Sequence, residues 1–457
     1  MTKKKFYVTT AIDYVNAKPH IGHAFEKVLA DALVRWKKLK GEKTWFLTGT
    51  DENAQKNVQA AKEAGIPVKK FVDDNSRAFK ELCEKLDVDY DRFIRTTEEE
   101  HRKKSQEIFK KVYSKGEIYK GNYEGSYCIG CESFKTEKEL IYGKCPEHPN
   151  KKIERMSEEA YFFDLSKYKN KLIDFAENYI VPAERKNEIL ARLENEELKD
   201  LCVSRINLDW GIDNPFDKKF KIYVWFDALI NYVSGAEGNW PADVHVVGKG
   251  INWFHSVIWP AILMSAGIEL PKKLLVHGYL NIGGKKISKS LGNVIDPIKL
   301  AEKYGSDSVR YSLLRCSVFE DSDYSEEILK ERNNELADKL GNLVSRVSAL
   351  AQRCGIKKCE NNLVKKFKLN EIEKHLESFE FDKALNEIFA FIDVCNEYVQ
   401  SKKPWETYDK RVLFELVDSI RKINPYLEIF IPKTSKKIEK IFKTDKIKKA
   451  NILFKKI

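Results

Sequence analysis

The start of the chain alternates between short apolar runs and a segment with helical spacing. Residues 6–12 form an apolar run with the length and composition of a buried strand. Between Phe25 and Trp36, apolar residues recur at intervals of three or four, which is the spacing of one helix face. A second apolar run covers residues 44–48. This order predicts a strand–helix–strand unit of a parallel sheet, in which ligands bind at the carboxyl ends of the strands.

Later segments extend this pattern and then replace it. A region rich in charges and turns, residues 116–219, interrupts the alternation. Before this region, residues 69–115 have helical spacing. After it, strands are predicted over 222–226, 244–248 and 274–278. From residue 307 onward the pattern predicts helices without further strands, with apolar stripes over 336–350, 384–398 and 413–423. The predicted fold is therefore α/β: a Rossmann-type parallel sheet split by an insertion and followed by an all-α helix bundle.

Composition narrows the classes of partner and location. The 457 residues carry a formal charge of +11, and Lys433 to Ile457 holds ten lysines against Glu439 and Asp445. Such a run favours a polyanionic partner, although a solvated helix face is the alternative. There is no apolar run of about 18 residues and no signal core, so we expect a soluble, cytoplasmic protein and no membrane partner. Nine cysteines, mostly scattered, argue against a disulfide framework.

Four residues inside the insertion have the spacing of a metal site. Cys128 and Cys131 form one pair, and Cys145 and His148 form a second pair after thirteen intervening residues. Two such pairs can complete a tetrahedron around zinc, and four protein ligands leave no open position for catalysis. The alternative, a redox Cys-x-x-Cys, lacks a thioredoxin-like frame around it. We therefore predict one structural zinc ion.

Two histidines follow the first predicted strand. The stretch from Tyr14 to Glu26 is a strand-to-helix turn in which His20 and His23 lie on one side of the first helical turn and Gly22 allows close backbone approach. A helix N-terminus binds anions, and two imidazoles there add donors for a phosphate group. The alternatives are metal ligation or two surface histidines.

A basic segment lies far downstream. Residues 285–293 include Lys286 and Lys289 and are flanked by Gly283, Gly284 and Gly292. Flanking glycines suit a moving loop, and the lysines supply charges for phosphates. The alternative is a solvated lysine-rich loop.

Asp51 follows the second predicted strand, where a carboxylate could meet a substrate ammonium group. Its other possible role is the N-cap of a helix over residues 52–64. Trp225, Ala228, Leu229 and Tyr232 share helical spacing, which suits either a core face or an apolar pocket. A thioether beside such aromatic rings makes a favourable contact.

Three residues of the predicted bundle could contact bases. Asn342 and Arg346 lie one turn apart, and Trp405 follows Pro404 at a predicted loop or helix start. An amide, a guanidinium and an indole can bond and stack the unpaired bases of RNA loops. The alternatives are a surface pair and a core residue.

The two phosphate segments together resemble the class I aminoacyl-tRNA synthetases. The signatures of that class, His-Ile-Gly-His and Lys-Met-Ser-Lys-Ser, stand here as residues 20–23 and 286–290. Residues 49–52, 223–228 and 403–405 also resemble the methionyl-tRNA synthetases, and this similarity extends along nearly the whole chain. The resemblance implies that methionine is activated with ATP and transferred to the terminal adenosine of tRNA(Met), initiator tRNA included.

The resemblance also assigns roles to residues. It implies catalysis by His20, His23, Lys286 and Lys289, with Gly22 and Lys249 as further ATP contacts. The implied methionine site is Ile12, Tyr14, Asp51, Trp225, Ala228, Leu229, Tyr232 and His255; the implied anticodon site is Asn342, Arg346 and Trp405; and the implied zinc ligands are Cys128, Cys131, Cys145 and His148. Mg²⁺ accompanies ATP in the implied reaction.

The implied domains follow the hydrophobic pattern. We expect the catalytic domain in two halves, residues 1–115 and 221–283, around a zinc-binding connective insertion at 116–220. A stem-contact region with the lysine loop follows at 284–335, and an anticodon-binding helix bundle at 336–457. No appended dimer-forming domain follows this bundle, so a monomer is expected.

Three positions depart from the family pattern. Asn53 and Ala54 stand where the family usually has His-Gly, Gly250 where it has an Asp that contacts the ATP ribose, and Asp13 where it has a Pro or an aromatic residue. Without that Asp, the ribose hydroxyls need Asn252, Asp13 or water. The alternative functions are a non-catalytic tRNA-binding paralogue and a class I synthetase for another apolar amino acid. The short insertion disfavours the leucine, isoleucine and valine enzymes, whose editing domain it cannot hold.

Overall fold

The computed structural model describes residues 4–131, 133–135, 139–206, 208–287 and 294–457. The chain forms two compact units. Unit 1 comprises Met1–Lys18, Thr44–Lys80 and Tyr90–Val276, and unit 2 comprises Pro19–Lys43, Glu81–Asp89 and His277–Ile457. Within the described ranges, no helix has the length and apolar character that crossing a membrane requires.

Unit 1 is built on a six-stranded sheet with the strand order β3-β2-β1-β11-β12-β7. These strands are β1 (Phe6–Tyr14), β2 (Thr44–Asp51), β3 (Arg92–Arg95), β7 (Ile180–Val181), β11 (Val244–Gly248) and β12 (Leu274–His277). β1 runs parallel to both β2 and β11, β2 to β3, and β12 to β7. The predicted parallel sheet and the predicted strands at 6–12, 44–48, 244–248 and 274–278 are confirmed.

The central strand β1 is buried on both faces. Tyr7, Val8, Thr9 and Thr10 have no exposed surface, as expected for a parallel strand covered on both sides. The Thr10 hydroxyl bonds to that of Thr48 at 2.7 Å, which satisfies both polar groups between β1 and β2.

Helices complete unit 1. They are α2 (Gln55–Glu63), α4 (Glu99–Ser114), α5 (Lys169–Tyr179), α6 (Ala183–Asn195), α7 (Val224–Leu229), α8 (Asn231–Ser234) and α9 (Trp259–Ala266), with the larger part of α3 (Val68–Lys85). Short turns of 3₁₀ or π-helix lie at Ser166–Tyr168, Lys249–Ile251 and Phe254–Ile258. The second and third of these turns contain Lys249 and His255, two of the candidate site residues.

Three local predictions in unit 1 are wrong. The region 69–115 is not helical throughout, because β3 lies between α3 and α4. The expected strand at 222–226 is mostly helix α7, and the short strand β10 (Phe220–Ile222) pairs antiparallel with β9 (Ser204–Ile206) outside the main sheet. All six residues of α7 are buried, so its first three residues continue the apolar run of β10 without a polar position, although the helical spacing from Trp225 to Tyr232 was recognised. Asp51 is not a helix N-cap, since α2 begins at Gln55 with Ala54 before it.

The predicted insertion carries a second, antiparallel sheet with the order β5-β4-β6-β8. Its strands are β4 (Ile118–Cys128), β5 (Ser133–Lys135), β6 (Ile153–Phe163) and β8 (Leu201–Cys202). β4 and β6 pair without interruption from Ile118↔Phe163 to Cys128↔Ile153. The insertion also supplies β7, the edge strand of the main sheet, so its chain returns to that sheet before residue 220.

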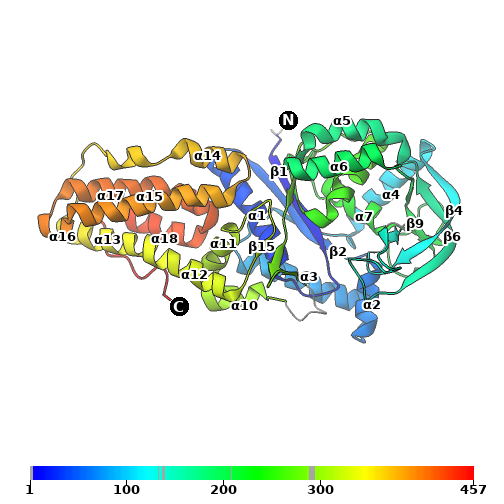
Figure 1. Ribbon diagram of the computed structural model, residues 1–457, viewed down its shortest axis with the longest axis horizontal. Helices are drawn as coiled ribbons and strands as arrows, with labels where there is room; N and C mark the ends of the chain where they lie inside the picture. The colour runs from blue at the N-terminus through cyan, green and yellow to red at the C-terminus, as the bar shows by residue number, and fades with distance from the viewer. Residues whose placement is uncertain (1–3, 132, 136–138, 207, 288–293) are drawn as a thin grey trace. The chain divides into compact units, whose positions relative to one another are not determined.

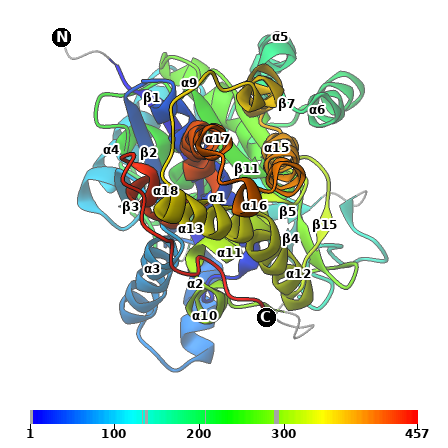
Figure 2. The same ribbon diagram turned by 90° about the vertical axis from the view of Figure 1, so that its left-hand side faces the viewer.

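Unit 2 is mainly helical, as predicted for the C-terminal part. Its helices are α1 (Ile21–Leu39), α10 (Pro297–Tyr304), α11 (Ser306–Leu314), α12 (Glu326–Leu336), α13 (Asn342–Cys354), α14 (Leu369–Glu377), α15 (Phe381–Lys402), α16 (Pro404–Thr407), α17 (Lys410–Phe430) and α18 (Pro432–Phe442). Figure 1 shows α15 and α17 side by side along their length, and Figure 2 shows them nearly end-on. π-Helical and 3₁₀ turns lie at Ala337–Gly341 and Leu363–Lys366.

A buried ion pair fixes α1 inside unit 2. Arg310 of α11 and Asp31 of α1 are both fully buried, with Nη2 and Oδ2 2.6 Å apart. The guanidinium also donates to the Phe430 and Ile429 carbonyls at the end of α17. Burial alone would raise the pKa of Asp31, but Arg310 and Arg35 beside it hold that pKa below its usual value. Because each charge is paired and hydrogen-bonded, the pair can persist without water.

A small three-stranded sheet precedes the bundle, in the order β14-β13-β15. Its strands are β13 (Leu280–Ile282), β14 (Lys285–Lys286) and β15 (Ser322–Asp323). The prediction that no strand follows residue 307 is therefore wrong at β15, a strand of two residues with no hydrophobic run to signal it.

Candidate active site

The two histidines of the first turn form a reciprocal cap on α1. His20 is the N-cap residue, and its Nδ1 accepts a hydrogen bond from the Gly22 amide at 3.1 Å. The His20 amide in turn donates to Nδ1 of His23 at 3.0 Å, and the two rings stack with centroids 3.7 Å apart. A nitrogen that accepts carries no hydrogen, so the neutral form of each ring has its hydrogen on Nε2. The cap therefore presents two ring N–H donors beside a helix N-terminus, an arrangement suited to a phosphate group.

The lysine segment lies next to this cap within unit 2. The Ile21 amide donates to the Ile295 carbonyl at 3.1 Å, and Cδ1 of Ile287 lies 3.8 Å from the position that a Cβ on Gly22 would occupy. That Cβ would also lie 3.0 Å from Cε1 of His20. Glycine is thus needed at position 22 because the His20 ring covers it, and the two motifs, far apart in the sequence, meet at one place.

The lysine segment begins as a hairpin rather than as a loop. β13 and β14 pair antiparallel, and Gly283 and Gly284 between them have φ values of +59° and +69°. Two successive positive φ values define the type I′ turn, which explains both glycines. Lys286 is exposed and its Nζ lies 4.9 Å from the centroid of the Tyr279 ring. Lys289 lies outside the described residues.

An aromatic group in unit 1 joins several of the predicted methionine contacts. The Trp225 ring stacks on Phe254 with centroids 3.7 Å apart and planes 10° from parallel. Tyr14, at the carboxyl end of β1, meets Trp225 edge-on at 6.2 Å. The other two predicted residues of α7, Ala228 and Leu229, are buried, and Leu229 belongs to the same core cluster as Trp225, against which Ile12 of β1 also packs.

Tyr232 and His255 form a polar pair within this apolar group. Nδ1 of His255 lies 2.9 Å from the Ile251 carbonyl, which can only accept, so Nδ1 carries a hydrogen. In the neutral ring Nε2 then accepts the Tyr232 hydroxyl at 2.7 Å. Both side chains are 1% exposed. A thioether fits such an environment of rings and satisfied polar groups.

His245 supports this pair from the sheet. The Trp259 indole, which can only donate, lies 3.4 Å from Nε2 of His245, so Nδ1 carries the hydrogen and donates to the Thr9 hydroxyl at 2.6 Å. Burial, together with nearby His255, lowers the pKa of His245 well below its usual value. The His245 ring therefore stays neutral at physiological pH, 4.3 Å from the Tyr232 ring.

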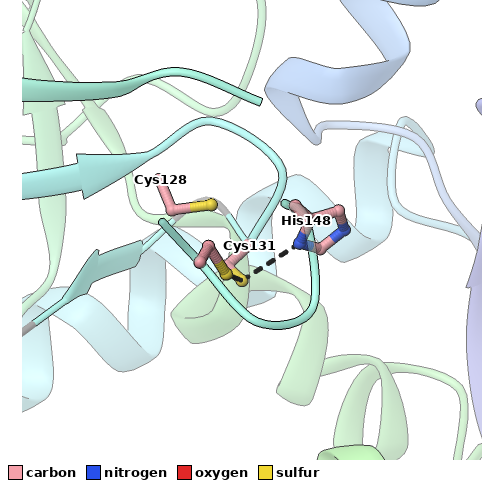
Figure 3. A group of neighbouring side chains, drawn as sticks. Cys128, Cys131 and His148 are labelled. Carbon is pink, nitrogen blue, oxygen red and sulfur yellow. Dashed lines mark hydrogen bonds between the residues drawn. The ribbon is translucent and has the colours of Figure 1, made fainter. Parts of the chain in front are cut away.

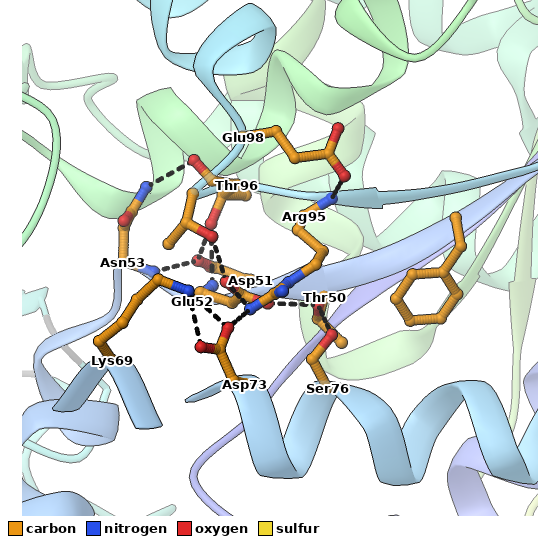
Figure 4. Close-up of polar contacts among 12 residues, drawn as sticks. Thr50, Asp51, Glu52, Asn53, Lys69, Asp73, Ser76, Arg95, Thr96 and Glu98 are labelled. Atoms are coloured by element: carbon orange, nitrogen blue, oxygen red, sulfur yellow. Dashed lines mark hydrogen bonds and ion pairs between the residues drawn. The ribbon is translucent and has the colours of Figure 1, made fainter. Parts of the chain in front are cut away.

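Asp51 ends β2 with a carboxylate that is 2% exposed. Its Oδ1 accepts the Asn53 amide at 3.2 Å and lies 3.5 Å from the Thr96 hydroxyl, as Figure 4 shows. The Thr96 hydroxyl in turn accepts the Glu52 amide at 2.8 Å. The carboxylate is thus held at the carboxyl end of a parallel strand, where an ammonium group could bind it.

Next to Asp51 lies an ionic network that runs from a buried carboxylate to the surface (Figure 4). The Glu52 carboxylate is fully buried and receives Nε and Nη2 of Arg95 at 2.5 and 3.0 Å. Arg95 also contacts Asp73 of α3, and Asp73 pairs with Lys69. Two-pronged Arg–carboxylate pairs fix geometry as well as charge, so this network anchors the turn that carries Asp51.

The residues considered for the ATP ribose contact differ in how exposed they are and in whether their side chains are already hydrogen-bonded. Lys249 and Gly250 follow β11 at its carboxyl end, and Lys249 is half-buried. The Asn252 side chain is 4% exposed, receives the Ser256 hydroxyl at 2.6 Å and donates to the Arg185 carbonyl at 3.3 Å. Asn252 could reach a ribose only by breaking these bonds, which disfavours it as the substitute for the missing Asp.

The four predicted metal ligands come together in the insertion. The candidate ligand atoms of Cys128, Cys131, Cys145 and His148 all lie within 4.8 Å of one another. Sγ of Cys131 is 3.3 Å from Sγ of Cys145 and 3.2 Å from Nδ1 of His148, and Figure 3 shows the latter contact. A Cβ on Gly130 would lie 2.3 Å from the His148 ring, so glycine is required there. Three thiols and one imidazole at these distances fit a tetrahedral metal ion.

The predicted base-contacting residues of unit 2 also lie together. The Arg346 guanidinium sits 5.4 Å from the centroid of the Trp405 ring, and Asn342 lies one turn before Arg346 on α13. Asn342 and Arg346 line a groove of about 640 Å³ with Asp338, Asp393 and Gln400 among its other walls. The groove offers donors, acceptors and a neighbouring indole to unpaired bases.

Several residues that support the site were not predicted from the sequence. Phe254 and His245 lie close to predicted residues, and a histidine inside an apolar strand such as 244–248 was the available signal for His245. His101 and Arg95 lie in the segment predicted to be only helical, and their contacts join residues far apart in the chain. No local sequence pattern marks such contacts.

Comparisons with known proteins agree with this geometry. The chain matches the family model described as tRNA synthetases class I (M) over residues 6–157 and 149–348, and that of the anticodon-binding domain of tRNA ligase over residues 366–456. The methionine–tRNA ligase of Clostridium tetani is 42% identical, over 97% of this chain and 75% of the relative. That of Brucella suis biovar 1 is 40% identical, over 96% of this chain and 92% of the relative.

A solved structure extends the similarity to the fold. Mycobacterium tuberculosis methionyl-tRNA synthetase in complex with methionyl-adenylate superposes with a TM-score of 0.90 and 36% identity, covering 96% of this chain and 94% of that chain. The resemblance first inferred from the two motifs is therefore confirmed. The chain belongs to the class I aminoacyl-tRNA synthetases and, within them, to the methionyl-tRNA synthetase family.

Proposed function

We propose that this protein is a methionine–tRNA ligase, which activates methionine with ATP and transfers it to tRNA(Met). The observation that carries this proposal is the meeting of the histidine cap and the lysine hairpin within unit 2, where Ile21 bonds to Ile295 and Ile287 approaches Gly22. Two motifs that bind phosphates in this family thus lie at one place, and a protein that only bound tRNA would not need them.

Methionine recognition is assigned to unit 1. The Asp51 carboxylate binds the substrate ammonium group, since it is buried and fixed at the end of β2. The side chain lies among Ile12, Tyr14, Trp225, Ala228, Leu229, Tyr232 and His255. A thioether gains about 0.3 to 1.5 kcal/mol from each aromatic contact, which favours methionine over smaller apolar amino acids.

The first step needs positioning and charge stabilisation. A methionine carboxylate oxygen attacks the α-phosphorus of ATP in line, the bond from that phosphorus to the bridging oxygen breaks, and pyrophosphate leaves with the electron pair. Nε2–H of His20 and of His23 donates to phosphate oxygens as their charge grows. Lys286 and Lys289 bind the departing pyrophosphate, and Mg²⁺ bound with ATP offsets further negative charge.

The second step transfers the methionyl group. The 2′-hydroxyl of the terminal adenosine attacks the acyl carbonyl, AMP leaves, and the hydroxyl proton is released. Asn342, Arg346 and Trp405 contact the anticodon of tRNA(Met), initiator tRNA included, through hydrogen bonds and stacking. The lysines that follow residue 433 strengthen this binding through phosphate contacts.

The metal site is proposed to be structural. Cys128, Cys131, Cys145 and His148 would hold one zinc ion and leave no position for a substrate. When bound, the ion supplies a fixed crosslink between the end of β4 and the segment 145–148. Metal analysis of purified protein should find one zinc per chain, and loss of that zinc in Cys131→Ala should accompany a lower melting temperature of the insertion.

The ribose contact, the oligomeric state and the location complete the proposal. Gly250 leaves the ATP ribose to Asp13, water or Lys249, since Asn252 is engaged elsewhere. We propose a monomer, because each substrate has contacts within this one chain. The cytoplasm is the proposed location because translation consumes the charged tRNA there.

The decisive experiment is ATP–pyrophosphate exchange with a panel of amino acids. We expect exchange with methionine at least about 100-fold faster than with leucine, isoleucine, valine or cysteine, since those side chains leave the aromatic contacts unfilled. Exchange with another amino acid would indicate a different class I synthetase. Absence of exchange with every amino acid, alongside tRNA binding, would indicate a non-catalytic paralogue.

A further inference from the structure

We propose that Asn53 is a positioning residue that holds the two ends of the amino-acid pocket in register. One end is Asp51, which receives the substrate ammonium group, and the other is helix α7, which carries Trp225. This inference rests on the proposed activation of methionine. It concerns a position where the chain departs from the His that its family usually has.

Asn53 reaches both ends from one residue. Its backbone amide donates to Oδ1 of Asp51 at 3.2 Å. Its Nδ2 donates to Oδ2 of Asp227 at 2.7 Å and to the Thr96 carbonyl at 3.2 Å. Both of these partners can only accept at neutral pH, so the amide nitrogen must face them and the side-chain orientation is fixed. Figure 4 shows Asn53 beside Asp51 and Thr96.

Asp227 belongs to α7 and is 1% exposed. Its Oδ1 lies 2.7 Å from Nε2 of His101 and accepts the Ser105 hydroxyl at 3.0 Å, and both of these residues lie on α4. Oδ2, the other oxygen of the Asp227 carboxylate, accepts the hydrogen bond from Asn53. α7 is therefore tied to α4 through one oxygen and to the Asp51 turn through the other.

The span between these ends matters because the ligand has a fixed length. The ammonium group and the thioether of methionine are joined by a short covalent chain, so Asp51 and Trp225 must be held at one separation for both to be contacted. Binding groups that shift by about 1 Å can lose up to about 100-fold in rate. Asn53 is the residue that bonds to the Asp51 carboxylate and to the α7 carboxylate at the same time.

The positioning role of Asn53 requires an uncharged side chain. An uncharged amide stands between the carboxylates of Asp51 and Asp227, and His101 of α4 faces the far side of Asp227. The isosteric change Asn53→Asp would replace the donor by a third carboxylate, which can donate only when protonated. Like charges at such distances raise the pKa of one of the carboxyl groups, so the defect should be larger at high pH.

The test is methionine-dependent ATP–pyrophosphate exchange by the full chain from pH 6 to pH 8.5. For Asn53→Asp we expect the KM for methionine to rise by about 100-fold at pH 8.5, because a bond to a charged group is lost and a repulsion added. At pH 6 we expect a rise of only about tenfold, because the carboxyl is then partly protonated. The KM for ATP should change by less than about twofold, since no phosphate contact is altered.

Two further variants separate positioning from folding. Asn53→His restores a ring N–H donor and should return the KM for methionine to within about fivefold of the natural protein, whereas Asn53→Ala should raise it by about tenfold at every pH. Asn195→Asp is the matched control, since Asn195 is an exposed residue of α6 whose side-chain amide donates to the Ala191 carbonyl, far from the pocket in the sequence. Thermal melting of each variant is the control for folding.

The outcomes distinguish this inference from the proposed function. If the natural protein exchanges pyrophosphate with methionine and folded Asn53→Asp matches it at every pH, Asn53 has no positioning role. If the KM values for methionine and ATP rise together without pH dependence, the change is merely structural and the inference is also wrong. If the natural protein shows no methionine-dependent exchange, the proposed function fails first.

Discussion

The proposed amino-acid pocket of unit 1 and the proposed phosphate-binding motifs of unit 2 are built in opposite ways. The proposed pocket takes residues from positions between 12 and 255 and buries most of them: Asp51, Tyr232 and His255 are at most 2% exposed, whereas Ile12 and Tyr14 are half-buried. The phosphate motifs use short contiguous stretches, in which His20 and His23 are half-buried and Lys286 is exposed. Selection of an apolar side chain requires a dry, supported site, whereas transfer of an adenylyl group requires donors presented to a charged ligand.

This difference has a testable consequence. Because the pocket is part of the core, changes there should reduce stability and substrate affinity together. The phosphate motifs lie on a helix cap and on an exposed hairpin. Changes there should therefore reduce the rate of pyrophosphate exchange and leave stability almost intact. The following experiments compare the two regions.

The largest effect is expected at the helix cap. In His20→Asn, the new side chain can still cap α1, since Asn is among the best N-cap residues, but the Nε2–H donor is lost. We expect methionine-dependent exchange to fall by about 10² to 10³-fold, the typical cost of losing one preorganised donor. The melting temperature should stay within about 2 °C. His20→Ala is the comparison variant, since it removes the cap as well and should also lower the melting temperature.

A smaller effect is expected in the pocket. Tyr232→Phe removes the hydroxyl that Nε2 of His255 accepts and leaves a buried acceptor without its donor. We expect the free energy of unfolding to fall by about 1 to 3 kcal/mol. The KM for methionine should rise by about tenfold, with the KM for ATP nearly constant. If the free energy of unfolding in denaturant and the melting temperature were both unchanged, the pocket would not be part of the stabilising core.

The positions of the two phosphate motifs could be predicted from the sequence because each motif is a short contiguous stretch. His20, Gly22 and His23 are neighbours, and one helix start suffices to bring them together. The metal ligands were predictable for the same reason, as two close pairs at the ends of one loop. Even so, the sequence did not predict the reciprocal hydrogen bonds of the cap or the type I′ turn before Lys285, because both depend on backbone angles.

The support of the pocket could not be predicted because it is non-local. Asn53 meets Asp227 across 174 residues, and His101 meets the same carboxylate across 126. The first three residues of α7, Val224–Phe226, were mistaken for the end of a strand because burial on all sides removed the polar face of the helix. Strand β3 was missed because its four residues, Arg92–Arg95, carry an arginine at each end and lack an apolar run.

The smallest effect concerns the polar support of unit 1 away from the pocket. Glu117 receives Lys167 and Tyr168 at 2.6 Å each and also contacts Ser265 at the end of α9. Burial alone would raise its pKa, but these bonds lower the pKa of Glu117 from 4.5 to about 2. A carboxyl whose folded pKa lies below its unfolded value stabilises the protein above the unfolded pKa and loses that effect as pH falls toward the folded pKa.

Glu117→Gln should therefore lower the free energy of unfolding by about 1 kcal/mol at pH 7. The difference from the natural protein should shrink between pH 4.5 and pH 2, as the natural carboxyl takes up its proton. Exchange activity at pH 7 should be unchanged. Denaturant unfolding at several pH values measures the free energy of unfolding of both proteins. If the difference between them persisted at pH 2, the charge of the Glu117 carboxylate would not be the source of the stabilisation.

The most direct test of the whole account is methionine-dependent ATP–pyrophosphate exchange by Lys289→Ala beside Lys285→Ala. Both changes remove a lysine from the same segment, but only Lys289 is assigned to pyrophosphate. We predict a fall of about 10² to 10³-fold for Lys289→Ala, less than about threefold for Lys285→Ala, and the same methionine affinity in both. A loss below fivefold in Lys289→Ala would contradict the claim that the distant lysine segment and the histidine cap act on one triphosphate.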